Sequence, residues 1–293
     1  MDGLLIKGIG GFYYVETENG CYECKARGVF RKNDIVPTVG DKVRLRVISE
    51  EKKIGNLEEI YPRKNQMLRP SIANVDHFMI VAPAKSPDFD TFFVDKLLVF
   101  CELYHISPFL VINKSDLDSG EVYGNIYEKI GYPVIYASAH TGEGLSQIEE
   151  TIRGGINVFA GFSGAGKSSI LNLLVKDANL LTGEISKLTR GRHTTRHSEL
   201  FLIAPDTYVA DTPGFSSLEI DFAISNLDWM FPEFRELSCQ FKGCSHTKEK
   251  GCGVIEQVQL GKIAPSRYES YCAIYEKIKD IKPWHKKTKG VSQ

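Results

Sequence analysis

The pattern of apolar and polar positions divides the chain into three segments of different character. In residues 1–62, short runs of aromatic and β-branched residues alternate with turn dipeptides such as Asn19-Gly20. Several short strands in so short a stretch predict a small all-β barrel of the OB or SH3 type. The basic stretch that follows, which prolines bound, makes residues 63–73 the expected linker. The strand-like runs in the first segment are residues 11–16, 21–27 and 42–48.

Residues 74–226 alternate strand-like apolar runs with helix-like segments, which predicts an α/β sheet. Nearly every unusual motif of the chain comes directly after one of these runs, where ligands bind in open α/β sheets. Residues 227–293 change to helical segments around a group of Cys and His residues. The five strand-like runs are residues 77–83, 108–112, 133–136, 156–160 and 208–210.

Composition places the chain among ordinary globular proteins. Its 293 residues are 42% hydrophobic and 25% charged, and the net charge is −1. No apolar run approaches the length of a membrane span, and the first residues lack the pattern of a signal peptide. We therefore expect a cytoplasmic protein without membrane contact. The two ends are net basic and the centre is net acidic, which fits either contact of the ends with a polyanion or ordinary solvated surfaces.

A phosphate-binding loop is predicted at Gly161–Ser168, GFSGAGKS, between the last long apolar run and a helical stretch at 169–176. Its glycines let backbone N–H groups point at phosphate oxygens, and the helix N-terminus adds a favourable dipole. We expect Lys167 to neutralise charge on the phosphates during catalysis and Ser168 to bind Mg²⁺. The expected contacts of the loop are Gly161, Phe162, Ser163, Gly164, Ala165, Gly166, Lys167, Ser168 and Ser169.

The motif NKSD at Asn113–Asp116 selects guanine over adenine. A carboxylate at Asp116 can accept two parallel hydrogen bonds from N1–H and N2–H₂ of guanine, whereas adenine presents an acceptor at N1. We expect Asn113 to tether the loops and the Lys114 stem to cover the face of the base. In the later motif ASA, the Ala139 N–H would meet guanine O6 and Ser138 would brace the loop.

The motif DTPG at Asp211–Gly214 fits a sensor of the γ-phosphate, although alone it could be an ordinary turn. Asp211 would help hold Mg²⁺, and the Gly214 N–H would bind the γ-phosphate and release it after hydrolysis. The mobile first switch must fall within 188–197, where Thr195, or alternatively Thr194, would complete the Mg²⁺ shell.

The residue that positions the attacking water is not a glutamine in this chain. Many GTPases place Gln directly after the DxxG motif, but here Phe215 follows DTPG and cannot orient water. His193, beside the switch threonines, is the candidate for positioning the water. The alternative is that His193 only belongs to a basic loop that touches RNA. The expected catalytic residues are thus His193, Lys167 and Thr195.

These motifs predict an Mg²⁺-dependent GTPase, but their order is rotated, because the base-reading motifs precede the phosphate loop. This rotation joins the second switch, which is the DTPG motif, directly to the C-terminal segment. Movement of this switch could therefore move that segment. Two alternatives are a metabolic P-loop ATPase or kinase, against which NKSD argues, and an RNA-binding factor with a relic nucleotide site. The intact Lys167, Ser168, Asp211 and Asp116 argue against the relic.

A zinc site is predicted by the spacing Cys-x4-Cys-x-His-x5-Cys in the C-terminal segment. Three thiolates and one imidazole suit tetrahedral Zn²⁺, and with no spare ligand position the site should be structural. Cys21 and Cys24 could be half of another metal site, but on a strand they are better explained as ordinary strand residues. Cys101 and Cys272 are expected in cores. The zinc ligands would be Cys239, Cys244, His246 and Cys252.

Together these residues resemble the circularly permuted, ribosome-small-subunit-dependent GTPases of the RsgA/YjeQ family along nearly the whole chain. The resemblance implies an OB domain at 1–62, a permuted GTPase domain at 74–226 and a helical zinc domain at 227–293. It also implies late maturation of the small (30S) ribosomal subunit, with hydrolysis stimulated by that subunit and contact with its 16S rRNA. We expect a monomer. Further motifs that carry the resemblance are Gly40–Val43, Ala73–Asp76, Gly191–Thr195 and Pro265–Tyr271.

RNA contact by the barrel would use its mixture of aromatic and basic residues, which suits stacking and phosphate contacts. The same aromatic residues could instead form the core of the barrel. The aromatic and basic residues of this mixture are Tyr13, Tyr14, Arg27, Arg31, Lys32, Arg44 and Arg46.

Overall fold

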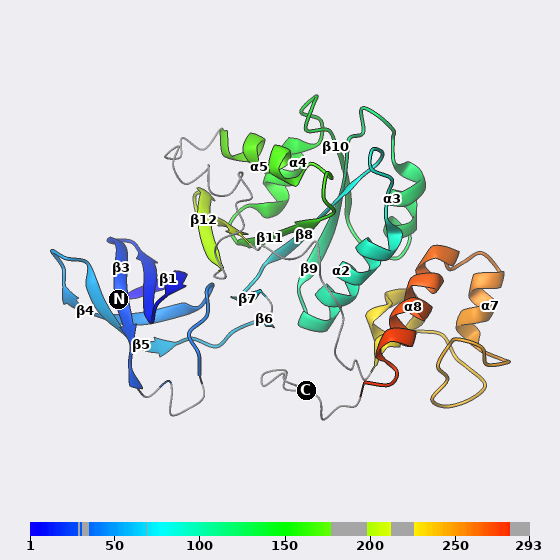
Figure 1. Ribbon diagram of the computed structural model, residues 1–293, viewed down its shortest axis with the longest axis horizontal. Helices are drawn as coiled ribbons and strands as arrows, with labels where there is room; N and C mark the ends of the chain where they lie inside the picture. The colour runs from blue at the N-terminus through cyan, green and yellow to red at the C-terminus, as the bar shows by residue number, and fades with distance from the viewer. Residues whose placement is uncertain (29, 31–34, 69, 177–197, 212–225, 282–293) are drawn as a thin grey trace.

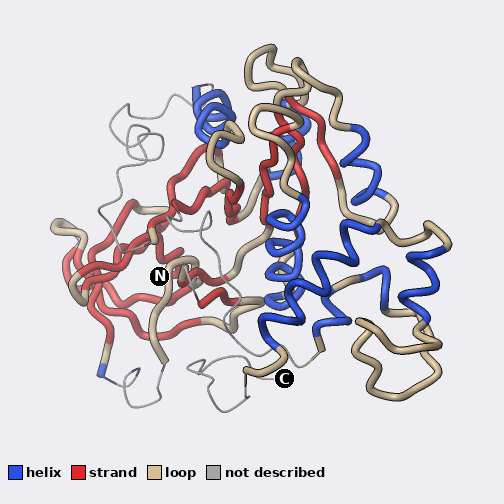
Figure 2. Tube along the Cα trace, turned by 45° about the vertical axis from the view of Figure 1, so that its right-hand side comes forward, coloured by secondary structure: helices blue, strands red, loops and turns tan. Residues whose placement is uncertain are grey.

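The computed structural model describes residues 1–28, 30, 35–68, 70–176, 198–211 and 226–281. In Figure 1 a β-barrel lies at the N-terminal end, an α/β layer structure forms the centre, and a helical module packs on the opposite side. Figure 2 shows the same division, with the barrel built of strands and the opposite side built of helices.

The N-terminal barrel has the OB-like arrangement that the sequence predicts. Its strands follow the order β1-β2-β3-β5-β4, and β4 closes the barrel by pairing with β1. Side chains alternate along β4, where Val43 and Leu45 are buried while Lys42 and Arg44 are exposed. The strands are β1 (Asp2–Ile9), β2 (Phe12–Thr17), β3 (Gly20–Ala26), β4 (Lys42–Ser49) and β5 (Ile54–Ile60).

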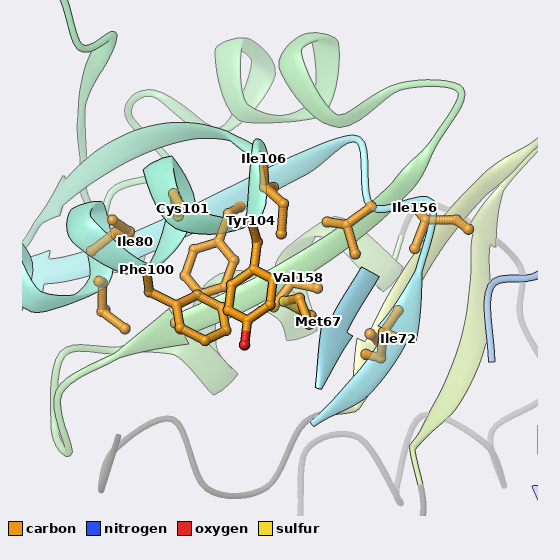
Figure 3. Packing of buried hydrophobic residues seen from close by; sticks show 14 of the residues in the cluster. Met67, Ile72, Ile80, Phe100, Cys101, Tyr104, Ile106, Ile156 and Val158 are labelled. Carbon is orange, nitrogen blue, oxygen red and sulfur yellow. The ribbon is translucent and has the colours of Figure 1, made fainter. Parts of the chain in front are cut away.

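The stretch expected as a linker contains a short antiparallel hairpin, β6 (Gln66–Leu68) with β7 (Ser71–Ala73). Met67 and Ile72 of this hairpin are fully buried. Figure 3 shows both residues in one apolar cluster with Tyr104. The connection between the barrel and the central domain is therefore packed into the core.

An ion pair fixes this connection to the barrel. The buried carboxylate of Asp41 accepts hydrogen bonds from Arg63 Nε at 2.6 Å and from Arg63 Nη2 at 2.8 Å. Such a bidentate pair holds one geometry, because the guanidinium is planar.

The central domain is a mostly parallel sheet in the order β10-β9-β8-β11-β13-β12. Each strand-like run predicted in this domain is a strand here, while β12 is an additional strand, antiparallel to β13. β12 also pairs with β1, with Glu199 opposite Lys7, so the sheet continues into the barrel. The strands are β8 (His77–Pro83), β9 (Ser107–Asn113), β10 (Val134–Ala137), β11 (Ile156–Gly161), β12 (Glu199–Ala204) and β13 (Thr207–Asp211).

Helices cover both faces of this sheet. Alternate residues of β8 enter different clusters: Phe78 and Ile80 pack with α2 and α3, and Met79 and Val81 pack with α4 and α5. This explains why the strand reads as a continuous apolar run. The helices are α2 (Thr91–Tyr104), α3 (Glu121–Glu128), α4 (Leu145–Ile152) and α5 (Lys167–Lys176).

The C-terminal module is mostly helical, as predicted, and has its own small core. Phe231, Phe234 and Tyr271 form a group of aromatic rings with centroids 5.0–5.3 Å apart, and Val99 of α2 completes the cluster. None of the helices in the described part of the chain is long and apolar enough to cross a membrane. The elements are η2 (Leu227–Met230), η3 (Pro232–Phe234), α7 (Gly253–Gln259) and α8 (Pro265–Ile278).

Candidate nucleotide and metal sites

The motifs meet at one edge of the sheet, although they are scattered along the sequence. Four strands, β9, β10, β11 and β13, run parallel. The last residue of each strand is the first residue of a motif. Because the carboxyl ends of parallel strands lie on one side, the rotated order still assembles a single site.

Asn113 joins three loops of this site. Its side chain is 1% exposed, and its Nδ2 donates a hydrogen bond to the Ala165 carbonyl at 2.7 Å. Its Oδ1 accepts the Ala139 N–H at 3.1 Å. The NKSD loop, the phosphate loop and the ASA loop are thus connected through one amide. Gly166 lies against it, because a Cβ there would come within 2.2 Å of Asn113 Nδ2.

Asp116 is exposed, and its carboxylate is oriented by a hydrogen bond. The Ser138 hydroxyl donates to Asp116 Oδ1 at 2.5 Å and accepts the backbone N–H groups of His140 and Thr141 at 3.2 and 3.1 Å. Ser138 is fully buried, so the donor side of this bond is shielded from water. The structure therefore brings the expected base-reading carboxylate and its expected brace together.

Lys114 contacts a segment that the sequence analysis did not single out. Lys114 has a left-handed backbone conformation with φ of 68°, and its Nζ donates to the Ser86 carbonyl. Ser86 belongs to the loop between β8 and α2. The Lys114 side chain, which is expected to cover the face of the base, is thus held by this loop.

A second link between the base-reading loops was also missed. The Ser115 hydroxyl donates to Glu143 Oε2 at 2.7 Å, and the Ser138 N–H donates to the Glu143 carbonyl at 3.0 Å. Glu143 belongs to no recognisable motif, and the partner of an exposed acidic residue is set only by the fold.

The phosphate loop curls between β11 and the N-terminus of α5, so the helix dipole points at it. Lys167 Nζ donates to the carbonyls of Gly161 and Phe162 at 2.6 and 2.9 Å. Burial lowers the pKa of the Lys167 ammonium, since the charged form loses hydration. Gly161 tolerates no side chain, because a Cβ would lie 2.2 Å from the Val81 carbonyl oxygen.

The other residues of the loop differ in their exposure to solvent. Ala165 is buried and Phe162 half-buried, with the Phe162 ring edge-on to Phe93 of α2 at 5.6 Å. Ser163, Gly164, Ser168 and Ser169 are exposed and can be reached by a ligand.

The expected catalytic residues His193 and Thr195, the alternative Thr194 and the expected phosphate sensor Gly214 lie outside the described residues, as does Phe215. Asp211 is the last residue of β13 and pairs with Glu199 in the register of the sheet. Asp211 thus lies on the strand next to β11, which leads to the phosphate loop.

The four predicted zinc ligands lie together in the C-terminal module. Their ligand atoms are all within 4.8 Å of one another. Cys239 Sγ and Cys252 Sγ are 3.8 Å apart, and each lies 3.4 Å from His246 Nδ1. Tetrahedral Zn²⁺ with usual bond lengths requires S–S separations of about 3.8 Å and S–N separations of about 3.6 Å. The residues therefore fit a zinc ion.

Contacts around this cluster hold its loop in place. The Gly253 N–H donates to Cys239 Sγ at 3.4 Å. The hydroxyls of Tyr268 and Tyr271 on α8 donate to the carbonyls of Thr247 and Ser245 at 3.0 and 2.9 Å. These two hydrogen bonds thus attach the loop to α8.

The remaining cysteines fall outside this cluster in the described chain. Cys24 is buried in the barrel while Cys21 is exposed, which agrees with ordinary strand residues on opposite faces. Cys101 is fully buried, and Cys272 packs against the core of the C-terminal module.

Comparison with known families matches two models to this chain. The RsgA N-terminal domain matches residues 2–55, and the RsgA GTPase matches residues 60–221. A small ribosomal subunit biogenesis GTPase RsgA from Ruminiclostridium cellulolyticum is 44% identical over 299 residues, which cover 99% of this chain and 98% of the relative. The protein of the same name from Bacillus anthracis is 43% identical over 292 residues, covering 96% and 99%.

Solved structures show the same arrangement. The crystal structure of YjeQ from Thermotoga maritima aligns with a TM-score of 0.82 at 34% identity, covering 96% of this chain and 99% of the other. YloQ, described as a circularly permuted GTPase, aligns with a TM-score of 0.78 at 37% identity, covering 96% of each chain.

Proposed function

The chain belongs to the RsgA family of GTPases, and from this premise we propose that it acts in biogenesis of the small ribosomal subunit, with its hydrolysis of GTP stimulated by that subunit. The side chain of Asn113 is the observation that carries the site assignment, because it bonds both the phosphate loop and the ASA loop. A base and its phosphates bound to these loops would belong to one ligand.

The base-reading part of the proposal gives each residue a contact. Asp116 would accept the two guanine donors, Lys114 would cover the base and Asn113 would hold the loops. The Ala139 N–H, which Asn113 Oδ1 accepts in the structure, would turn to donate to O6. Ser138 keeps the Asp116 carboxylate in the orientation that two parallel hydrogen bonds need. An adenine base would leave this carboxylate facing an acceptor, which costs several kcal/mol, or on the order of a thousandfold in affinity.

The phosphate part uses Gly161–Ser169 and the positive end of α5. Lys167 would turn from its carbonyl partners to the β- and γ-phosphates, where it stabilises the charge of the transition state. Ser168, Thr195 and Asp211 would hold Mg²⁺, which neutralises phosphate charge when bound. The Gly214 N–H would sense the γ-phosphate.

We assign the attacking water to His193, because Phe215 offers no polar group for it. Slow turnover of the free protein is expected, since the water is held well only when a partner orders the switch segments. The stimulating partner is the small subunit.

The C-terminal module would hold one structural zinc ion through Cys239, Cys244, His246 and Cys252. All four ligand positions are filled by the protein, which leaves none for a substrate. A bound zinc ion would hold the loop 239–252 in the fold.

We further propose that the protein works as a monomer in the cytoplasm and contacts 16S rRNA through its end domains. The barrel presents Lys42, Arg44 and Arg46 on the exposed side of β4. Rows of basic side chains of this kind bind phosphate backbones and make affinity dependent on salt.

The proposed function is tested by GTP turnover with and without purified small ribosomal subunits. We expect slow release of phosphate from GTP alone and a saturable increase on addition of subunits, with ATP left unhydrolysed. Unchanged turnover at saturating subunit concentration would remove the ribosomal role, and equal hydrolysis of ATP would remove the base assignment.

A further inference from the structure

Helix α2 has two different faces, and they contact different parts of the molecule. Phe93, Leu97 and Phe100 pack on the central sheet. The residues of the other face recur at intervals of three and four positions, which places them on one side of a helix. They meet the C-terminal module, and they are Phe92, Asp95, Val99 and Glu102. Figures 1 and 2 show α8 alongside α2.

A buried arginine forms the centre of this contact. Arg267 of α8 is 1% exposed, and its Nη1 donates to Asp95 Oδ1 at 2.7 Å. Its Nε and Nη2 donate to the two oxygens of Glu233 at 2.7 and 3.1 Å. The guanidinium carbon lies 4.6 Å from the centre of the Phe231 ring. A charge so far from water is stable only while both carboxylates stay in place, which fixes α2 relative to the module.

The same carboxylate reaches a third element. The hydroxyl of Tyr127 on α3 donates to Asp95 Oδ1 at 3.0 Å. Asp95 is fully buried and accepts from both Tyr127 and Arg267. It therefore joins the central domain to the C-terminal module at one atom.

The N-terminal end of α2 contacts the phosphate loop. Asp90 caps the helix by accepting the Phe93 N–H at 2.9 Å. The Phe93 ring then meets the Phe162 ring of the loop edge-on at 5.6 Å. The loop that precedes α2 also adjoins the phosphate loop, because a Cβ at Gly164 would lie 3.5 Å from Pro87.

These contacts form a continuous path from the zinc module to the phosphate loop. We propose that Arg267 fixes α2 through Asp95 and that α2 fixes the phosphate loop through Phe93, so that both are positioning residues for nucleotide binding. This path lies entirely within the described residues and does not pass through the second switch. The inference rests on the proposed nucleotide site and adds the element through which the C-terminal module controls it.

A double-mutant cycle on release of fluorescent GDP tests this coupling. Arg267→Lys keeps the charge but loses the fork that binds two carboxylates, and Phe93→Leu removes the ring contact. We expect each single variant to raise the release rate about fivefold, within the range of coupling energies between distant sites. The double variant should also release GDP about fivefold faster, because both changes interrupt one path.

Independent contributions would instead multiply to about 25-fold and would overturn the proposal. Arg63→Lys, which weakens the buried pair with Asp41 in the barrel, is the matched control and should leave GDP release unchanged. Equal acceleration in this control would show general loosening and also overturn the proposal.

If Arg267→Lys does not fold, Glu233→Gln replaces it in the same cycle, because it removes one charge partner at nearly constant shape. If the unaltered chain does not bind fluorescent GDP, the proposed nucleotide site is overturned as well. Normal binding with unaltered release in both single variants would overturn the coupling alone.

Discussion

The Asn113 amide donates a hydrogen bond to the Ala165 carbonyl at 2.7 Å, across 52 residues of sequence. Asn113 comes before the phosphate loop in this chain, yet the two meet because β9 and β11 flank the same strand, β8. Rotation of the motif order therefore still allows the NKSD loop to meet the phosphate loop.

The contact between Gly166 and Asn113 gives a matched pair of variants. Gly166→Ala would place a methyl group 2.2 Å from Asn113 Nδ2, whereas Gly131→Ala meets nothing within 4 Å. Both glycines have φ of 91°, so the backbone strain, about 1–2 kcal/mol, is shared. We expect Gly166→Ala to weaken GTP binding about tenfold or more and Gly131→Ala to leave it unchanged, by titration with fluorescent GTP. Equal affinities would mean that the tether does not shape the site.

Lys167 is the next test, because its charge is predicted to act on the phosphates. Lys167→Met should lower turnover by about 10²–10³, as removal of a transition-state donor usually does. Lys129→Met changes an exposed lysine at the end of α3 and is the control. Phosphate release at saturating GTP is the measurement, and nearly normal turnover of Lys167→Met would exclude the assigned role.

His193 is predicted to act on the water and not on binding. His193→Ala should reduce turnover by about 10²–10⁴ while GTP affinity stays within about twofold. His197→Ala, in the same segment of sequence, should behave like the unaltered chain. Single-turnover hydrolysis combined with equilibrium binding separates the two effects, and undiminished turnover in His193→Ala would assign the water to another group.

The zinc site predicts different results for two cysteines of one module. Cys244→Ser removes a ligand from the Cys₃His cluster, and Cys272→Ser removes a thiol outside it. We expect one zinc ion per chain in the unaltered protein and in Cys272→Ser. Cys244→Ser should bind zinc on the order of a hundredfold more weakly and expose residues 239–252 to protease. Metal analysis after dialysis is the measurement, and a zinc content that is the same in both variants would refute the ligand set.

Much of the fold follows from local signals in the sequence. β8 consists of His77 followed by six apolar residues, and its boundaries agree with the predicted 77–83. The phosphate loop and NKSD could be found because their chemistry requires fixed spacings. The positions of their strands then follow from the rule that ligands bind at carboxyl ends.

Other features depend on partners that are distant in sequence. Met67 and Ile72 lie in a basic stretch that reads as a linker, but they are buried in an apolar cluster with residues distant in sequence such as Tyr104. Arg267 sits in a polar helix and reads as a surface residue, but Asp95, 172 residues away, makes its burial possible. No local pattern reveals such pairs, which is why the contact between α2 and α8 could not be predicted.

We propose that the rotated motifs form one guanine-nucleotide site that the small ribosomal subunit activates. Asp116→Asn tests it most directly, because an amide can donate to the second oxygen of xanthine but cannot accept both guanine donors. Hydrolysis of GTP and of xanthosine triphosphate is measured for both proteins with saturating small subunits. We predict that the unaltered chain prefers GTP by about a hundredfold or more, and that the variant prefers xanthosine triphosphate with stimulation retained. Stimulated GTP hydrolysis that is equal in both proteins would contradict the account.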